Sequence, residues 1–207
     1  IMAHGDDKGL KLPPKLAPHQ IVIVPIIPND KDKDSVMTVV NQLNDTLSEF
    51  RVIIDDRSEV SPGFKFNEWE QKGVPLRVEV GPKDIEKNTI LVSRRDDESK
   101  NSYPMDNVQN TLKKLLDEIQ DNLYKNSENT LKENTTHVES FSELIEVLNS
   151  KKGFVSCFWK ENKEDELKIK EETSATLRCY PLENTDSEKA VNSDSENGNF
   201  AIFSKAY

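Results

Sequence analysis

Between Ile54 and Asp84 the sequence brings aromatic, acidic and basic side chains close together. The side chains with useful chemistry are Phe64, Phe66, Glu68, Trp69, Glu70, Arg77 and Lys83. Proteins read single-stranded RNA by stacking unpaired bases on aromatic rings or arginine planes and by contacting the base edges with polar groups. A carboxylate can accept hydrogen bonds from both donors of guanine, and lysine or arginine can contact its O6 and N7 acceptors. These residue types therefore suit a surface that reads guanine in RNA.

The same residues also fit a purely structural interpretation. Residues 64–72 have the composition of a solvated amphipathic helix, and residues 76–80 that of an ordinary strand. For Arg77 the structural alternative is an ion pair with Glu79 or Asp84, which needs no RNA. The residue types alone leave both interpretations open.

Strands and helices alternate around this stretch. Runs of β-branched residues predict strands, and apolar residues three or four apart predict helices. The predicted strands cover 21–27, 51–55, 76–80 and 89–93, and the predicted helices cover 35–50 and 64–72. A Gly81-Pro82 turn is expected to close the third strand. This order predicts an α/β domain with a mostly parallel, mixed sheet flanked by helices.

A long helix over residues 106–131 is predicted to follow. A smaller α+β module then comes from helices over 140–149 and 164–173 and from strands over 154–159, 176–181 and 200–203. Its predicted core consists of Phe154, Val155, Phe158, Leu167, Ile169, Leu177, Ile202 and Phe203. Residues 183–199 contain almost no apolar side chain, so they predict a disordered loop.

Length and composition narrow the class of protein. The chain has 207 residues, 34% hydrophobic and 32% charged. No apolar run approaches the roughly 18 residues that a membrane span needs, and the first residues do not resemble a signal peptide. Two cysteines are too few for a disulfide framework and indicate a reducing compartment. We therefore expect a cytoplasmic protein with no membrane partner.

The net charge of −10 is unusual for a protein that binds RNA. Residues 61–100 carry 8 basic and 8 acidic side chains, whereas residues 101–207 carry 13 basic and 20 acidic ones. The excess of negative charge thus lies mostly outside the candidate RNA-reading stretch. Phosphate contacts need only a local basic patch. The acidic balance argues against strong nonspecific binding of nucleic acid.

Taken in order and without gaps, the motifs between Ile54 and Asp84 resemble the signature stretch of the anticodon-binding domain of prolyl-tRNA synthetases. Further resemblances extend over nearly the whole chain. Residues 4–14 resemble the exit from the third class II catalytic motif, and residues 17–26 resemble the entry strand of the anticodon-binding domain. Residues 170–181 and 204–207 resemble the C-terminal module of the archaeal and eukaryotic type.

The resemblance implies a domain organisation and a function. Residues 1–16 would form the end of the class II catalytic domain and a linker, residues 17–125 the anticodon-binding domain, and residues 136–207 the C-terminal module. The implied function is recognition of the proline tRNA anticodon. The implied anticodon-binding residues are Phe66, Glu70, Arg77, Lys83, Asp84 and Lys100. Phe66 would stack on a base, Glu70 and Asp84 would accept from guanine, and Arg77 and Lys83 would contact guanine acceptors or phosphate.

No catalytic residue is expected in this chain. The chain carries neither the first two class II motifs nor a Gly-rich phosphate loop, so it is interpreted as the C-terminal part of a ligase and is expected to be inactive alone. In the parent enzyme the resemblance implies ATP and magnesium as cofactors, aminoacylation of proline tRNA, and a homodimer. It also places the C-terminal residue, Tyr207, against the catalytic domain. The alternative is a stand-alone, noncatalytic tRNA-binding or dimerisation module of the same fold.

The C-terminal module of this family often holds a zinc ion on four cysteines. Tetrahedral structural zinc needs four Cys or His ligands in two close pairs. By the resemblance, the first pair falls near Lys160 and Asp165, and the second within residues 184–199, where no cysteine occurs. We therefore expect no metal site. Cys157 and Cys179 are predicted to face a core.

Overall fold

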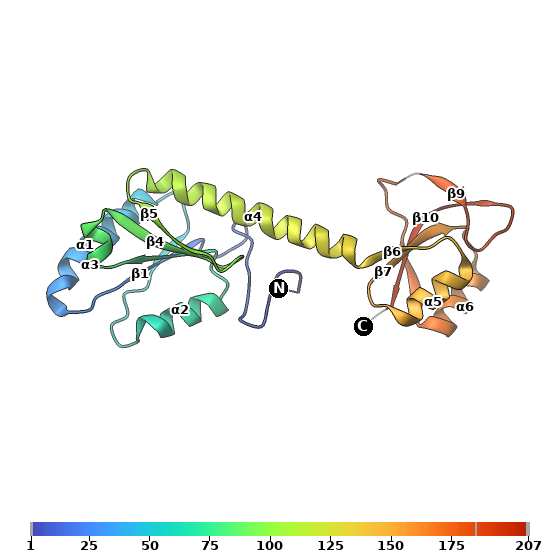
Figure 1. Ribbon diagram of the computed structural model, residues 1–207, viewed down its shortest axis with the longest axis horizontal. Helices are drawn as coiled ribbons and strands as arrows, with labels where there is room; N and C mark the ends of the chain where they lie inside the picture. Colours follow the sequence, from blue (N-terminus) through green and yellow to red (C-terminus); the bar gives the residue numbers. More distant parts are fainter. Residues whose placement is uncertain (1, 185, 206–207) are drawn as a thin grey trace. The chain divides into compact units, whose positions relative to one another are not determined.

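The computed structural model of the protein describes residues 2–184 and 186–205, and it divides into two compact units with a boundary between Ser127 and Glu128 (Figure 1). Each unit has its own five-stranded sheet and its own hydrophobic core. The predicted fold class, an α/β domain with a mixed sheet followed by a small α+β module, is confirmed. The domain limits at residues 16, 125 and 136 remain predictions.

The first unit is built on a mixed sheet. Strand β1 lies between β2 and β3 and runs parallel to both, whereas β4 and β5 are added antiparallel beyond β3. The strands are β1 (Ile21–Pro25), β2 (Val52–Ile54), β3 (Leu76–Val80), β4 (Thr89–Arg94) and β5 (Lys100–Pro104). Strand β5 was not predicted, because its side chains are polar and mostly exposed and lack the alternation of a half-buried strand.

Helices cover the two faces of this sheet unequally. One face carries the main core, formed by strand residues such as Ile23 and Val78 with apolar side chains of α1 (Lys33–Thr46) and α4 (Val108–Glu133). A short 3-10 helix, Asp30–Asp32, precedes α1. On the opposite face α2 (Pro62–Gln71) packs against β1. Figure 1 shows α2 and α4 on opposite sides of the sheet.

The open part of the α2 face is polar. Residues directly opposite one another in neighbouring strands point to the same side of a sheet. Val22, which belongs to the α2 core, is opposite Arg77 in β3, Arg77 is opposite Ser93 in β4, and Ser93 is opposite Lys100 in β5. A polar row therefore continues from the edge of α2 across β3, β4 and β5.

A buried polar network fixes α2 to the end of β2. The Asp55 carboxylate accepts from Trp69 Nε1 at 2.8 Å and from two guanidinium nitrogens of Arg57 at 2.8 and 2.7 Å. Lys65, itself buried, donates to the Asp55 carbonyl at 3.0 Å. The Ser61 hydroxyl caps the first turn of α2 by accepting from the Phe64 N–H. The Asp-Asp-Arg motif thus orients the helix that carries Phe66 and Glu70.

The segment before β1 docks on the C-terminal end of α2. Leu10 donates its N–H to the Gln71 carbonyl at 3.0 Å, and Leu12 donates to the Gly73 carbonyl at 3.3 Å. Gly73 has a φ of +72°, and a Cβ there would lie 2.6 Å from the Leu10 side chain. A glycine is required both by this conformation and by this close approach.

The second unit is a small sheet with two helices on one face. The strand order is β6-β7-β10-β8, with β9 added to β10. The elements are β6 (Thr135–His137), α5 (Phe141–Ser150), β7 (Phe154–Trp159), α6 (Lys163–Thr173), β8 (Ala175–Cys179), β9 (Ser187–Lys189) and β10 (Asn197–Lys205). Its core joins Leu144, Leu148, Trp159, Ile169 and Phe203.

The prediction of a disordered loop over residues 183–199 was wrong for residues 186–199. Ser187–Lys189 pairs with Asn197–Asn199 in an antiparallel ladder. Between them Val191 donates its N–H to the Phe158 carbonyl at 2.8 Å, and the Asn192 amide exchanges hydrogen bonds with the Lys160 backbone. Backbone pairing with the end of β7 organises this polar stretch, and composition does not reveal such pairing.

Two predicted core residues of the second unit are exposed. Leu167 is 59% exposed because Ile169 occupies the inner face of α6, and residues two apart on a helix point in nearly opposite directions. Phe154, at the start of β7, is 38% exposed. Val155, Ile169 and Phe203 are buried as predicted, and Leu177 packs against them.

The Gly-Pro pair ends β3 as predicted, but it starts a helix and not a simple turn. Gly81 caps helix α3 (Pro82–Glu86), and Pro82 occupies the first helical position, where its missing N–H is of no consequence. The prediction for Tyr207 lies outside the described residues. No helix within the described part of the chain is both long and apolar enough to span a membrane.

Candidate nucleic-acid interface

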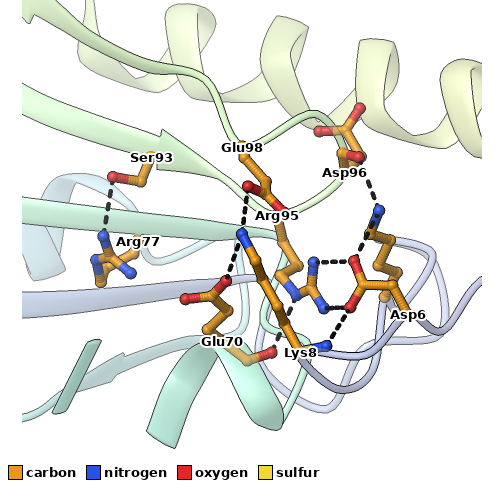
Figure 2. Close-up of polar contacts among 9 residues, drawn as sticks. Asp6, Lys8, Glu70, Arg77, Ser93, Arg95, Asp96 and Glu98 are labelled. Atoms are coloured by element: carbon orange, nitrogen blue, oxygen red, sulfur yellow. Dashed lines mark hydrogen bonds and ion pairs between the residues drawn. The ribbon is translucent and has the colours of Figure 1, made fainter. Parts of the chain in front are cut away.

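A cavity of about 220 Å³ opens beside the C-terminal end of α2, over the polar part of the sheet. It is lined by Lys8, Glu70, Val74, Arg77, Ser93, Arg94, Arg95, Glu98 and Lys100. Figure 2 shows that side chains from the N-terminal segment, α2 and the strands meet here. Segments far apart in the sequence therefore build one polar site.

Four of the six predicted anticodon-binding residues lie at or beside this cavity. Glu70, Arg77 and Lys100 line it. Phe66, one turn before Glu70 on α2, has the Arg77 guanidinium carbon 4.2 Å and Lys100 Nζ 5.6 Å from its ring centre. The structure thus assembles an aromatic ring, a carboxylate and two cations, the set of groups that base recognition needs.

The other two predicted residues lie on α3, beyond the C-terminal end of β3. The Asp84 carboxylate accepts the Gly81 N–H at 2.9 Å, so one of its oxygens caps the helix. The Lys83 side chain is exposed. The six residues therefore form two groups, one around the cavity and one on α3.

A single carboxylate holds both cations of the first group. Glu79, only 5% exposed, lies 3.3 Å from Arg77 Nε and 2.9 Å from Lys100 Nζ. Arg77 Nη2 also donates to the Ser93 hydroxyl at 3.1 Å (Figure 2). The ion pair considered as the structural alternative for Arg77 is thus present, with Glu79 as its partner. Two cations facing one carboxylate still leave local positive charge.

The Glu70 carboxylate is held less closely than that of Glu79. Its nearest cation, Lys8 Nζ, is 4.0 Å from Oε1, and its side chain is 31% exposed. By contrast, its backbone carbonyl is firmly held, since Arg95 Nε donates to it at 3.0 Å. The backbone of Glu70 is therefore fixed while its oxygens stay available to accept hydrogen bonds.

Sequence reasoning did not assign Lys8, Arg94, Arg95 or Glu98 to the site. Arg94 pairs with Asp96 and with Glu118 of α4, so it serves the fold. Arg95 is buried and pairs with Asp6, where its hydrogen bonds hold the pKa of the Asp6 carboxyl far below its usual range. Two adjacent arginines directly after an apolar strand were the available signal, because a buried guanidinium needs acceptors.

A metal centre requires several ligand side chains close together. Among residues 2–184 and 186–205 there is no group of three or more His, Cys, Asp or Glu side chains that could hold an ion. Cys157 is buried in β7, and burial raises the pKa of its thiol to about 12. Cys179 is exposed, so the prediction that it faces a core was wrong. Absence of zinc from the protein remains a prediction.

Comparison with known proteins matches both units to families. Residues 20–115 match the anticodon binding domain family, and residues 141–207 match the family described as prolyl-tRNA synthetase, C-terminal. Over the full length of this chain, the sequence is 43% identical to a proline–tRNA ligase of Roseiflexus sp., and the match covers 44% of that ligase. It is 45% identical to one of Natranaerobius thermophilus over 88% of the chain and 38% of the relative.

A proline–tRNA ligase of Amoebophilus asiaticus is 39% identical over the whole chain and 43% of its own length. The chain therefore spans less than half the length of these curated relatives. The sheet order, the polar cavity beside α2 and the two family matches agree with one another. This chain belongs to the prolyl-tRNA synthetase family and carries its anticodon-binding domain and its C-terminal domain.

Proposed function

We propose that the chain reads the two guanines in the anticodon of proline tRNA. The observation that carries the proposal is the cavity itself, whose lining combines the accessible carboxylate of Glu70 with the cations Arg77 and Lys100, next to Phe66. Guanine presents N1–H and N2–H donors together with O6 and N7 acceptors. A site with one acceptor side chain and two donor side chains complements that pattern.

The first guanine is assigned to the cavity. Glu70 accepts from N1–H and N2–H, and Arg77 or Lys100 donates to O6, N7 or a neighbouring phosphate. The Arg77 guanidinium lies on the Phe66 ring, so the pair forms one stacking platform in which arginine and aromatic planes both serve. Glu79 keeps both cations in place before RNA arrives, which reduces the ordering cost of binding.

The second guanine is assigned to Lys83 and Asp84. A carboxylate has about four lone-pair sites, and the cap on Gly81 uses one of them, so Asp84 can still accept from a base. Lys83 is exposed and free to approach a guanine acceptor or a phosphate. Two separate groups of side chains match a recognition task with two bases.

In the whole enzyme this recognition would select the tRNA that receives proline. We infer that the parent protein is a cytoplasmic, homodimeric ligase that uses ATP and magnesium, and that this chain supplies recognition without chemistry. The match of residues 141–207 to the prolyl-tRNA synthetase C-terminal family favours this role over a stand-alone tRNA-binding module.

Replacement of Glu70 by glutamine tests the assignment. The Glu70→Gln side chain keeps one oxygen but loses the charge and the second acceptor, so the guanine N2 donor is left unpaired. We expect the chain's preference for an anticodon stem-loop with guanine, over one with inosine at the same position, to fall by about 1–3 kcal/mol. Inosine lacks only the N2 amino group. Fluorescence anisotropy at fixed salt measures both affinities.

Glu172→Gln is the matched control, because it removes the same charge from an exposed position on α6. It should leave the guanine preference unchanged. If Glu70→Gln still discriminates guanine from inosine as well as the parent chain does at both anticodon guanines, then Glu70 does not read a base.

A further inference from the structure

The segment Asp6–Leu12, before β1, docks beside the cavity and contributes Lys8 to its lining. Arg95 joins it to α2, because the same guanidinium donates to the Asp6 carboxylate at 3.0 Å and to the Glu70 carbonyl at 3.0 Å. Lys11 reinforces this clamp, with its Nζ 3.0 Å from Asp6 and 3.2 Å from the Asp96 carbonyl. Backbone bonds from Leu10 and Leu12 to the end of α2 complete the docking.

The docked segment places Lys8 at the cavity, between two carboxylates. Its Nζ lies 2.5 Å from Glu98 Oε2 and 4.0 Å from Glu70 Oε1, and all three side chains line the cavity. Figure 2 shows the ammonium group between the two acidic side chains. Of these two, Glu98 holds Lys8 closely, whereas Glu70 stays at the limit of an ion pair.

From this arrangement we propose that Lys8 is a specificity-determining residue of the guanine site that acts by positioning Glu70; the inference rests on the proposed function. Glu98 anchors the ammonium, and the ammonium in turn draws the Glu70 carboxylate toward the cavity. Without Lys8, Glu70 and Glu98 would face each other as two like charges, and Glu70 would turn toward solvent. Both Glu70 oxygens must face the base to accept from N1 and N2 together.

The 4.0 Å separation suits this role. A close ion pair would compete with guanine for the carboxylate oxygens, whereas a looser one orients them and leaves their lone pairs available. When guanine donors reach Glu70, Lys8 retains its partner Glu98, so no charge is left unpaired. The cavity thus exchanges a weak contact for a stronger one on binding.

The test compares Lys8→Met with Lys8→Arg in the full 207-residue chain. Methionine keeps an unbranched side chain close in length to the lysine stem but has no charge, whereas arginine keeps the charge. Affinities are measured for anticodon stem-loops with guanine or inosine at each anticodon guanine. We expect Lys8→Met to lower the guanine-over-inosine ratio at the Glu70 position by roughly fivefold, within the range for coupled neighbouring groups. Lys8→Arg should retain most of the guanine-over-inosine ratio of the parent chain.

Lys72→Met is the matched control. Lys72 is as exposed as Lys8, with 53% against 54% of its side chain accessible, and it also pairs with a glutamate, Glu68, but it does not line the cavity. Its loss should leave the ratio unchanged. In a Glu70→Gln background, Lys8→Met should have no further effect on the guanine-over-inosine ratio, because the carboxylate that Lys8 positions is absent.

Two results would overturn the inference. Equal loss of affinity for guanine and inosine RNAs in Lys8→Met would identify a phosphate contact, and an unchanged ratio would mean that Glu70 needs no help. A parent chain that does not prefer guanine would refute the proposed function itself. A parent that prefers guanine through Glu70, but whose Lys8→Met variant keeps that preference, would refute only the role of Lys8.

Discussion

Asp55 shows how a single residue acts on the site without touching it. The residue is 4% exposed, and its carboxylate is held by Arg57, Trp69 and Lys65, the side chains that tie α2 to the sheet. The hydrogen bond from Arg57, with help from Trp69 and Lys65, lowers the pKa of Asp55 to about 2 against the desolvation that opposes ionisation. The placement of Phe66 and Glu70 therefore depends on a buried charge.

Replacement of Asp55 by asparagine should give a stability loss that depends on pH. The folded-state pKa lies below the unfolded value, so ionised Asp55 stabilises the fold above about pH 4, and this contribution disappears as the pH falls from about 4 to 2. We expect Asp55→Asn to lower the free energy of unfolding by about 2 kcal/mol at pH 7 and by much less near pH 2. Urea unfolding at a series of pH values measures the difference.

Asp56→Asn serves as the control, since its side chain is exposed next to Asp55. It should change stability little at any pH. A loss for Asp55→Asn that is the same at pH 7 and pH 2 would show that the ionised form has no special role.

At the scale of elements, the end of α2 is the junction that assembles the site. The helix stops at Gln71, Gly73 reverses the chain with a positive φ, and the N-terminal segment packs against that turn. Glu70 and Lys8 come together only because these two segments are adjacent. The geometry of the turn should therefore matter for stability and for recognition alike.

Two glycines of the same region give a matched pair of variants. In Gly73→Ala the new Cβ lies 2.6–2.7 Å from Leu10 atoms, backbone included, at a φ that L-residues avoid. We expect a loss of more than ~1 kcal/mol in the free energy of unfolding and weaker guanine preference. In Gly63→Ala the Cβ meets nothing within 4 Å inside a helix. We expect a neutral or stabilising effect of up to ~1 kcal/mol.

Chemical denaturation of both variants, with the stem-loop binding assay, measures these effects. Equal stability of Gly73→Ala and Gly63→Ala would mean that the N-terminal segment leaves the turn at no cost. In that event the close approach of Leu10 to Gly73 would not be essential to the fold.

For the whole molecule, the net charge is negative, whereas the candidate site is rich in positive side chains. The chain carries −10 overall, yet the cavity region exposes cations on the open sheet face. Charge repulsion therefore disfavours general binding of nucleic acid, and the affinity must come from a few local contacts. This pattern fits a domain that tests a few bases and leaves most of the backbone untouched.

Catalysis is not expected from this chain alone. Its 7 glycines are scattered and form no phosphate-binding loop. When the chain is incubated with proline, ATP and labelled pyrophosphate, exchange into ATP should stay at the level of a reaction without proline. A proline-dependent signal in the purified chain would contradict the division between recognition and chemistry proposed above.

The sequence was sufficient for the order of most elements and for the types of the candidate recognition residues. Apolar residues identified β1, β3, β4 and β7: β1 is a continuous, fully buried apolar run, whereas the apolar side chains of the other three stand among polar ones. Strands β5, β6 and β9 escaped prediction, since they are held mainly by backbone pairing and carry polar side chains. Local amino-acid composition does not indicate such backbone pairing.

The candidate site divides in the same way. Sequence and resemblance together named Phe66, Glu70, Arg77 and Lys100, whose types already suggest base recognition. Only the tertiary structure showed that Lys8 and Arg95 contact Glu70. Lys8 is more than sixty residues from Glu70 in the sequence, and Arg95 is twenty-five residues from it. The sequence determines which chemical groups are present. Which side chains contact Glu70 depends on how the sheet, the end of α2 and the N-terminal segment pack together.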